Sequence, residues 1–357
     1  MITPKFTNGS GSTFHSELKK RVNQYFSERK LSPTGNASLY FKAILLCTIY
    51  LALYVHLVFF TPIGWLAIIE CFIIGGITAG IGFNVMHDGA HGSFSKNKLT
   101  NQVAAFSANM LGASGIMWHQ KHNILHHTYT NIDGVDDDIE IKPFIRMCKT
   151  QKRYWIHRFQ HIYVWFLYTL LLIIWLFVSD YSKYFKMKVG NVKISNLSIG
   201  EHVGFWAAKV GYFLMMVVLP IYMVGFLPWL AGFLCMVLFA GLVLSTVFQL
   251  AHTVEETAFP LPNSDTNKVE NEWAIHQLET TANFATTNRT ISWLLGGLNF
   301  QIEHHLFPRI CHIHYPAISK IIKETCREFN VKYIENKKMW HAIVSHTIHL
   351  KRMGVAK

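Results

Sequence analysis

Long apolar stretches alternate with polar segments along this chain. Four of the stretches have the roughly 20 apolar residues that a helix needs to cross a bilayer core of about 30 Å. They cover about residues 40–60, 63–86, 203–224 and 227–250. Only a few residues, among them Pro62 and Pro228, separate the two members of each pair, so the pattern predicts two transmembrane hairpins.

A fifth apolar stretch, at residues 162–178, is shorter, and lysine and arginine residues flank it on both sides. Basic flanks favour the cytosolic side of a membrane. A full crossing would also put His252, after the last span, on the opposite face from His87, after the second span. We therefore expect an interfacial or re-entrant helix here, with Trp165 and Trp175 at the depth of the lipid headgroups.

The polar ends of the chain complete the expected layout. Residues 1–39 are predicted to be a basic cytosolic tail with a short amphipathic helix near residues 14–26, and residues 336–357 a basic C-terminal tail. The region between the tails, residues 40–335, is predicted to be one domain. The fold class predicted is an all-α integral membrane protein.

The composition indicates whether the basic chain binds nucleic acid or a membrane surface. The 357 residues are 51% hydrophobic and only 15% charged, whereas an average soluble domain is about 25% charged. A net charge of +12 could serve nucleic acid or an anionic membrane surface. So few charges among so many apolar residues favour the membrane and argue against nucleic acid. The six cysteines include no C-x-x-C pair, which excludes a disulfide scaffold.

The candidate chemistry lies in the spacing of the 20 histidines. His87 and His91 are four residues apart, just past the second apolar stretch, and so share one face of a helix. His122 and His126 repeat this spacing. The adjacent His127 turns about 100° away, so it can face a second ion.

Two further groups follow later in the chain. Gln301 shares a helix face with His304 and His305, and His252 directly follows the last apolar stretch, at the membrane depth of His87. The eight histidines of all groups give four imidazoles for each of two ions. Imidazole suits iron, copper, nickel or zinc, and structural zinc sites are usually single and rich in thiolate. Two adjacent transition metals bound through nitrogen therefore indicate redox chemistry.

Acidic residues lie beside each histidine group. Carboxylates commonly accept the second N–H of a metal-bound histidine, although a solvated acidic loop is the alternative for residues 136–138. The candidates are Asp88, Asp133, Asp136, Asp137, Asp138, Glu255, Glu256 and Glu303. His119 and His276 are candidate outer groups, whereas three histidines of the basic tail are expected at the surface: His341, His346 and His349.

Taken in order around the two hairpins, the motifs H-x-x-x-H, H-x-x-x-H-H and Q-x-x-H-H resemble those of the membrane fatty acid desaturases. The segments KHNILHHTYTN (121–131) and GGLNFQIEHHLFP (296–308) are similar to the front-end branch. Enzymes of that branch desaturate between an existing double bond and the carboxyl end. The resemblance covers about residues 40–335, and it implies four transmembrane helices capped by a cytosolic helical domain that holds two irons.

The resemblance also implies roles for individual residues. The metal ligands, which are also the catalytic residues, would be His87, His91, His122, His126, His127, His252, His304 and His305. Gln301 replaces the histidine that other branches carry at the start of the third motif. It would bind cofactor iron directly or through a water molecule.

The implied activity is O₂-dependent desaturation, at a delta-6-like position, of a fatty acyl chain carried on CoA or on a membrane lipid. The chain has no H-P-G-G haem motif, so electrons would come from a separate carrier of the ferredoxin or cytochrome b5 type. The expected location is a bacterial cytoplasmic membrane, with the multi-pass protein holding its active site on the cytosolic side.

Two other functions stay open at the level of sequence. A fatty acyl or lipid hydroxylase or monooxygenase of the same superfamily would share the metal site, although the third motif favours a desaturase. A metal transporter would place its histidines in mid-membrane along a pathway, whereas these histidines follow the ends of the apolar stretches.

Overall fold

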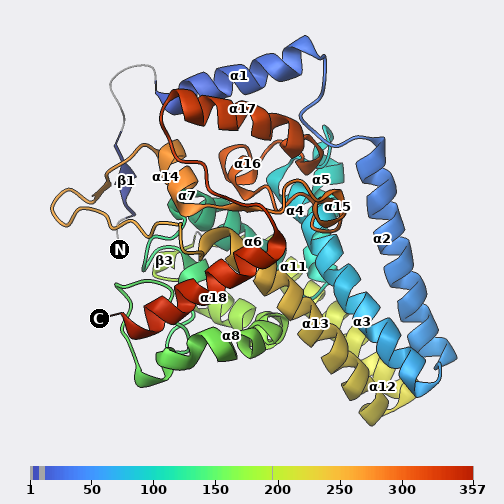
Figure 1. The fold of residues 1–357 in the computed structure, drawn as a ribbon. Coiled ribbons are helices and arrows are strands. Elements are labelled where there is room, and N and C mark those ends of the chain that lie inside the picture. The colour runs from blue at the N-terminus through green and yellow to red at the C-terminus, as the bar shows by residue number, and fades with distance from the viewer. Residues whose placement is uncertain (1–2, 8–12, 195, 357) are drawn as a thin grey trace.

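The computed structural model describes residues 3–7, 13–194 and 196–356, and most of these residues are helical. Four helices are long and apolar enough to cross a membrane: Ala37–Phe60, Gly64–His91, Ile199–Val224 and Phe226–His252. Figure 1 shows the long helices running away from a group of shorter helices gathered at one end. The predicted all-α membrane fold with four long apolar helices in two hairpins is confirmed.

Short π-helical turns interrupt three of the four long helices. The first joins α2 (Ala37–Val55) to η1 (His56–Phe60), and the second joins α3 (Gly64–Ile81), η2 (Gly82–Met86) and α4 (His87–His91). The third joins α11 (Ile199–Phe213), η7 (Leu214–Val218) and α12 (Leu219–Val224), and the fourth is α13 (Phe226–His252) alone. The first histidine motif and His252 therefore lie within the last turns of these helices, not after them.

Pro220 interrupts the backbone hydrogen bonding of the third long helix, and side chains pair with the carbonyls nearby. Proline has no N–H to close the helical hydrogen bond one turn back, and an unsatisfied carbonyl is costly in a bilayer. The carbonyl of Met216 instead accepts a hydrogen bond from the Trp229 indole at 2.8 Å. The neighbouring Met215 carbonyl accepts one from the Tyr54 hydroxyl. Side chains from both hairpins thus replace the missing bond and lock the hairpins together.

The fifth apolar stretch forms a broken helix. Its two halves, Trp155–Thr169 and Leu171–Lys186, meet at a bend of 60°. The first half contains η5 (Trp155–Phe159) and α8 (Gln160–Thr169); the second contains α9 (Leu171–Ile174), η6 (Trp175–Ser179) and α10 (Asp180–Lys186). By length and composition the pair could count as one more span, and its interfacial placement stays a prediction.

Four helices form a cap over the ends of the long helices: α1 (Phe14–Glu28), α14 (Trp273–Thr280), α16 (Gln301–Leu306) and α17 (Tyr315–Glu328). The expected amphipathic helix near residues 14–26 is α1. Its apolar side chains recur every four residues, at Phe14, Leu18, Val22 and Phe26, and all are buried in the cap core with Ile318 and Ile322 of α17. An ion pair of 2.6 Å between Arg21 and Glu328 reinforces this contact.

The remaining elements link the cap to the long helices. They include α5 (Lys98–Met110), α6 (Gly115–Trp118), α7 (His127–Tyr129), α15 (Arg289–Leu294), α18 (Met339–Val355), η4 (Asp137–Ile139) and η8 (His312–His314). Short strands pair as β1 (Lys5–Phe6) with β4 (Lys268–Val269), β2 (Lys188–Val189) with β3 (Val192–Lys193), and β5 (Asn283–Phe284) with β6 (Glu335–Asn336). The pairs β1–β4 and β5–β6 are parallel and β2–β3 is antiparallel.

The C-terminal helix α18 corrects one expectation from the sequence. His346 and His349 are buried rather than at the surface. The imidazole of His349 donates to the Met147 carbonyl at 2.8 Å. The guanidinium of Arg146 caps the end of α18 by donating to the carbonyls of Met353 and Ala356 at 2.8 and 2.7 Å. Contacts with residues about 200 positions earlier in the chain hold this helix, which is why local pattern did not reveal its burial.

Candidate metal centre

The eight predicted histidines come together in one buried cluster between the long helices and the cap. His87, His91, His122 and His304 each offer a nitrogen within 4.8 Å of the others, and so do His126, His252 and His305 in a second group. His127 lies between the groups, with its Nε2 3.2 Å from Nε2 of His122 and its ring stacked on that of His305 at 4.4 Å. The chain thus forms two adjacent sets of imidazole ligands.

A π-helical segment makes the second histidine motif serve both groups. The motif lies on η3 (His119–His126), which continues into α7 with His127. A π-helix has wider turns than an α-helix, and such segments are common at functional sites. His122 faces the first group and His126 faces His252 of the second, their Nε2 atoms 3.3 Å apart. His127 lies between the two groups, next to His122 of the first and His305 of the second.

Hydrogen bonds at Nδ1 orient several of these rings. His305 donates from Nδ1 to the Gln277 side-chain oxygen at 2.8 Å, and His252 donates to the Thr280 carbonyl at 3.2 Å. Nδ1 of His304 lies 3.1 Å from the Tyr315 hydroxyl. In each case Nε2 is left facing the centre, which is the arrangement that outer partners impose on metal-binding histidines.

His126 has acidic partners, as the sequence predicted. Its Nδ1 lies 3.1 Å from the Asp136 carboxylate and 3.2 Å from that of Asp138. Burial opposes the charged imidazole, but the two carboxylates outweigh it and raise the pKa of His126. Lys121 pairs with Asp138 at 2.6 Å and completes a half-buried charge network beside His126.

The other predicted acidic partners point elsewhere. Asp88 accepts a hydrogen bond at 2.8 Å from Nδ1 of His312 on η8, and Glu303 accepts one at 2.7 Å from the Tyr333 hydroxyl. Asp133, Glu255 and Glu256 form ion pairs with lysine or arginine residues away from the centre. Of the candidate outer groups, His119 bonds to Asn123 and His276 packs on Phe6.

The state of the cluster nitrogens fits metal ligation. Nε2 of His87, His91, His304 and His305 is buried without a hydrogen-bond partner. Leaving a buried polar atom unpaired is costly. Four unpaired nitrogens in one place therefore indicate an ion that binds them. Burial, reinforced by neighbouring histidines, also lowers the pKa of His122, His127, His304 and His305 well below the usual range. These imidazoles are therefore neutral, the form that binds metal.

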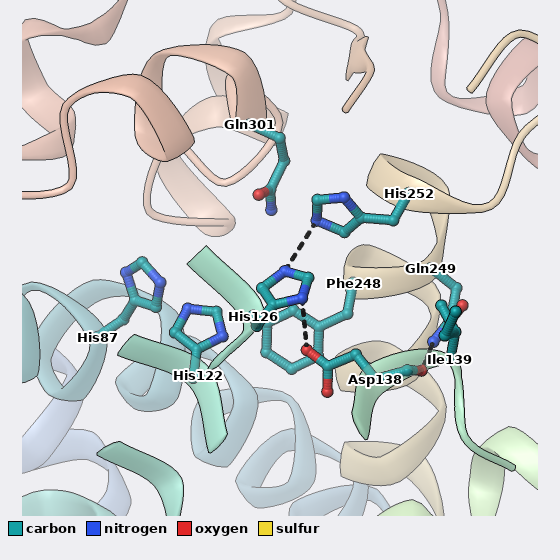
Figure 2. Close-up of a pocket in the computed structure, with 9 residues that line it drawn as sticks. All are labelled: His87, His122, His126, Asp138, Ile139, Phe248, Gln249, His252 and Gln301. Carbon is teal, nitrogen blue, oxygen red and sulfur yellow. Dashed lines mark hydrogen bonds and ion pairs between the residues drawn. The ribbon is translucent and has the colours of Figure 1, made fainter. Parts of the chain in front are cut away.

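Gln301 enters the centre from the cap helix α16. Figure 2 shows its side chain reaching toward the gap between His87 on one side and His126 and His252 on the other. Together with His122 these residues line a small cavity closed by Ile139 and Phe248. The glutamine is buried, and it sits where it can reach a group bound between the two sets of imidazoles.

Comparison with known proteins places this centre in a family. The family model described as "Fatty acid desaturase" matches residues 63–337, which include every histidine of the cluster. The chain belongs to the fatty acid desaturase family. The resemblance read from the three motifs is thereby confirmed.

Several relatives match the chain over nearly its whole length. An sn-1 linoleoyl-lipid 6-desaturase of Arthrospira platensis is 36% identical, covering 99% of this chain and 96% of the relative. A protein of the same name from Synechocystis sp. is also 36% identical, covering 99% and 98%. An acyl-lipid (8-3)-desaturase of Physcomitrium patens is 35% identical, covering 99% of this chain and 74% of the relative.

Sequence reasoning missed several residues of this desaturase that form hydrogen bonds with the clustered histidines. Gln277, Thr280 and Tyr315 orient ligand rings, yet none of them lies in a histidine motif. They reach the cluster only because α14 and α17 pack in the cap next to α16. An uncharged glutamine or tyrosine in a helix carries no local signal of such a role.

Proposed function

We propose that this chain introduces a double bond at the delta-6 position of a membrane-associated fatty acyl chain, using two irons held by the eight clustered histidines. The observation that carries the proposal is the convergence of two sets of imidazoles, in which Nε2 of His87, His91, His304 and His305 is buried without a hydrogen-bond partner. Two irons in this centre would supply the O₂-dependent, two-electron oxidation of an unactivated methylene pair, which amino-acid side chains cannot perform. The names of the two cyanobacterial relatives support the delta-6 position and an acyl-lipid substrate.

The chain's own residues would hold and shield this chemistry. Gln277, Thr280, Asp136 and Asp138 fix ligand rings through Nδ1. The cap and the ends of the long helices bury the centre and exclude water, which strengthens every electrostatic contact inside it. These four residues act through the histidines that they orient, so we count the four as positioning residues.

A membrane-borne substrate fits the placement of the centre. His87 and His91 end one long apolar helix and His252 ends another, so the centre lies where those helices leave the apolar layer. A cavity of about 620 Å³ shares Asp138, Phe248 and Gln249 with the small cavity at Gln301. Its lining combines apolar side chains of the bent helix pair with several lysines. Such a lining offers room to part of an amphiphilic acyl substrate.

We further infer that the centre faces the cytosol of a bacterial cell and receives electrons from a separate ferredoxin or cytochrome b5 type carrier. The basic segments near the ends of the long helices support the cytosolic side. The cyanobacterial relatives support a bacterial membrane. Cysteine labelling from outside intact cells tests the topology: a cysteine placed near Lys183, at the exposed Lys186, should be protected, and outside labelling there would overturn it.

Product analysis tests the proposed reaction. We expect a bacterial host that expresses the chain and is fed linoleate to accumulate a trienoic acid with its new double bond at the delta-6 position, seen by gas chromatography of methyl esters. His126→Ala and His305→Ala should each abolish the product while the protein still inserts in the membrane. A hydroxylated product would instead assign the chain to the alternative, hydroxylase chemistry, and one zinc with no iron in the purified protein would refute the two-iron centre.

A further inference from the structure

The helix α5 carries an apolar stripe that no described part of the chain covers. Leu99, Val103, Phe106 and Met110 recur at intervals of three or four residues, which places them along one face of the helix. Their exposed fractions are 66%, 66%, 52% and 68%. A single exposed apolar side chain is ordinary, but a continuous exposed stripe marks an interaction surface.

The opposite face of α5 is fixed to the first histidine motif. Ala104 and Ala108 on that face are buried. Gly89, between His87 and His91, lies so close to α5 that a Cβ placed there would come within 2.6 Å of the Ala104 Cβ. Only glycine permits this approach, so α4 and α5 are packed against each other at the first histidine motif. Whatever holds the stripe therefore also fixes the position of the first motif.

A third side of α5 is polar and borders a cavity at the surface. Asn101, Gln102 and Asn109 line a cavity of about 1030 Å³ together with His91 and Trp118. The helix therefore has a small-residue side against α4, a polar side along this cavity and an exposed apolar side, of which Phe106 also lines the cavity.

Charge and neighbours indicate what covers the apolar stripe. Lys96 and Lys98 are exposed at the start of α5, and the helix contains no acidic residue. The helix also contacts α11, at the start of the third long apolar helix. Just after α5 the Gly112 carbonyl accepts a hydrogen bond of 2.7 Å from Lys209 of α11. With 13 residues α5 is too short to cross a bilayer, so any contact of its stripe with lipid would be at the membrane surface.

We propose that α5 lies in the membrane–water interface, with its apolar stripe in the acyl boundary and its lysines among anionic headgroups, and that it sets the depth of the first histidine motif. A basic, amphipathic helix of this kind binds through buried apolar area and attraction to anionic lipid. Because α5 contacts the motif closely at Gly89, the depth of α5 in the interface determines how far His87 and His91 lie from the apolar core of the membrane.

Lipid quenching tests the placement. Cysteines are introduced one at a time, as Leu99→Cys, Val103→Cys, Phe106→Cys and Met110→Cys, in the full chain with Cys47 and Cys235 changed to alanine. Each variant that elutes as a single species is labelled with a polarity-sensitive fluorophore and reconstituted in vesicles of phosphatidylcholine and phosphatidylglycerol with brominated acyl chains. Gln102→Cys, on the polar side of the same helix, and Lys320→Cys, exposed on α17, are the matched controls.

We expect bromine quenching at every stripe position to exceed that at Gln102 and to be several-fold stronger than at Lys320. Stripe quenching no stronger than that at Lys320 overturns the proposal. Stripe labels that are shielded from lipid and self-quench at low lipid-to-protein ratio would assign the stripe to a second copy of the chain, and would also overturn it. The measurement needs no substrate, so its outcome is independent of the proposed desaturation.

Discussion

At the scale of single residues, the partner of Nδ1 decides which nitrogen of a histidine is free to bind a metal. The Gln277 side-chain oxygen accepts hydrogen bonds from both His305 and the Thr130 hydroxyl, at 2.8 and 2.9 Å. Gln277 is fully buried. The ring of His305 is therefore fixed by a residue that lies outside the three histidine motifs.

Gln277→Leu should loosen His305 and lower both iron content and activity, because the leucine removes the acceptor at nearly the same volume. Losing such an outer partner typically costs about 10- to 100-fold in metal affinity or activity. Iron per chain, measured by mass spectrometry at limiting iron, checks the effect. Gln277→Glu keeps an acceptor oxygen and should retain more iron; equal loss in both variants would show that the site tolerates no change there and refute a specific role for the hydrogen bond.

Substitutions of Gln301 should reduce activity but, unlike those of Gln277, leave the iron content nearly unchanged. Its side chain reaches the gap between the two groups of histidines (Figure 2). We expect Gln301→Leu to keep nearly wild-type iron and lose most desaturation, and Gln301→His to keep iron and turn over weakly. Iron analysis and product yield from the same preparations check this. Near-normal desaturation by Gln301→Leu would restrict the site to the eight histidines.

At the scale of elements, α18 supports the end of α13. His346 bridges two structures: its Nε2 accepts from the Tyr168 hydroxyl of α8 at 2.8 Å, and its Nδ1 donates to the Thr253 carbonyl at 2.7 Å. Thr253 directly follows His252. The Ser345 hydroxyl also accepts a hydrogen bond of 3.0 Å from the backbone N–H of Glu255. The C-terminal helix thus braces the segment after the last long helix.

His346→Ala should destabilise the protein and reduce iron binding, because it leaves the buried Tyr168 hydroxyl and Thr253 carbonyl unpaired. The cost is about 1–3 kcal/mol for each such group. Thermal unfolding in detergent and iron per chain measure the two effects. His341→Ala, on the same helix but half-buried beside Trp340, is the control and should change neither. A matching loss in both variants would contradict the bridging role.

At the scale of the whole molecule, the sequence predicted what repeats locally and missed what depends on distant contacts. The four long helices follow from runs of apolar residues, and the cluster follows from the spacing of His87, His122 and His304 with their neighbours. The burial of His346 and the hydrogen bond between Gln277 and His305 could not be predicted from the sequence. These contacts depend on helices that meet only after folding, and they use residue types that are equally common at surfaces.

The whole molecule should be more stable with metal than without it, because a ligand that binds only the folded state adds stability. At free iron about 100 times its dissociation constant, each site would contribute about 2.7 kcal/mol. Stripping with a chelator should therefore lower Tm, and re-adding ferrous iron should restore it. A His126→Ala, His305→Ala double variant should respond less to the chelator; a wild-type Tm that ignores metal would refute the proposed centre.

The scattering of the clustered histidines along the chain has a consequence for how the protein is made in the cell. On the proposed ligand set, the first ligand is His87 and the last is His305, with three of the long apolar helices completed only after residue 87. No complete centre can exist until residue 305 has left the ribosome and both hairpins have entered the membrane. On that ligand set iron would be the last component to bind. Chains made during iron starvation would contain a cluster of buried nitrogens without partners. Membrane proteases would degrade such chains preferentially. The supply of iron would then determine the abundance of the enzyme as well as its activity.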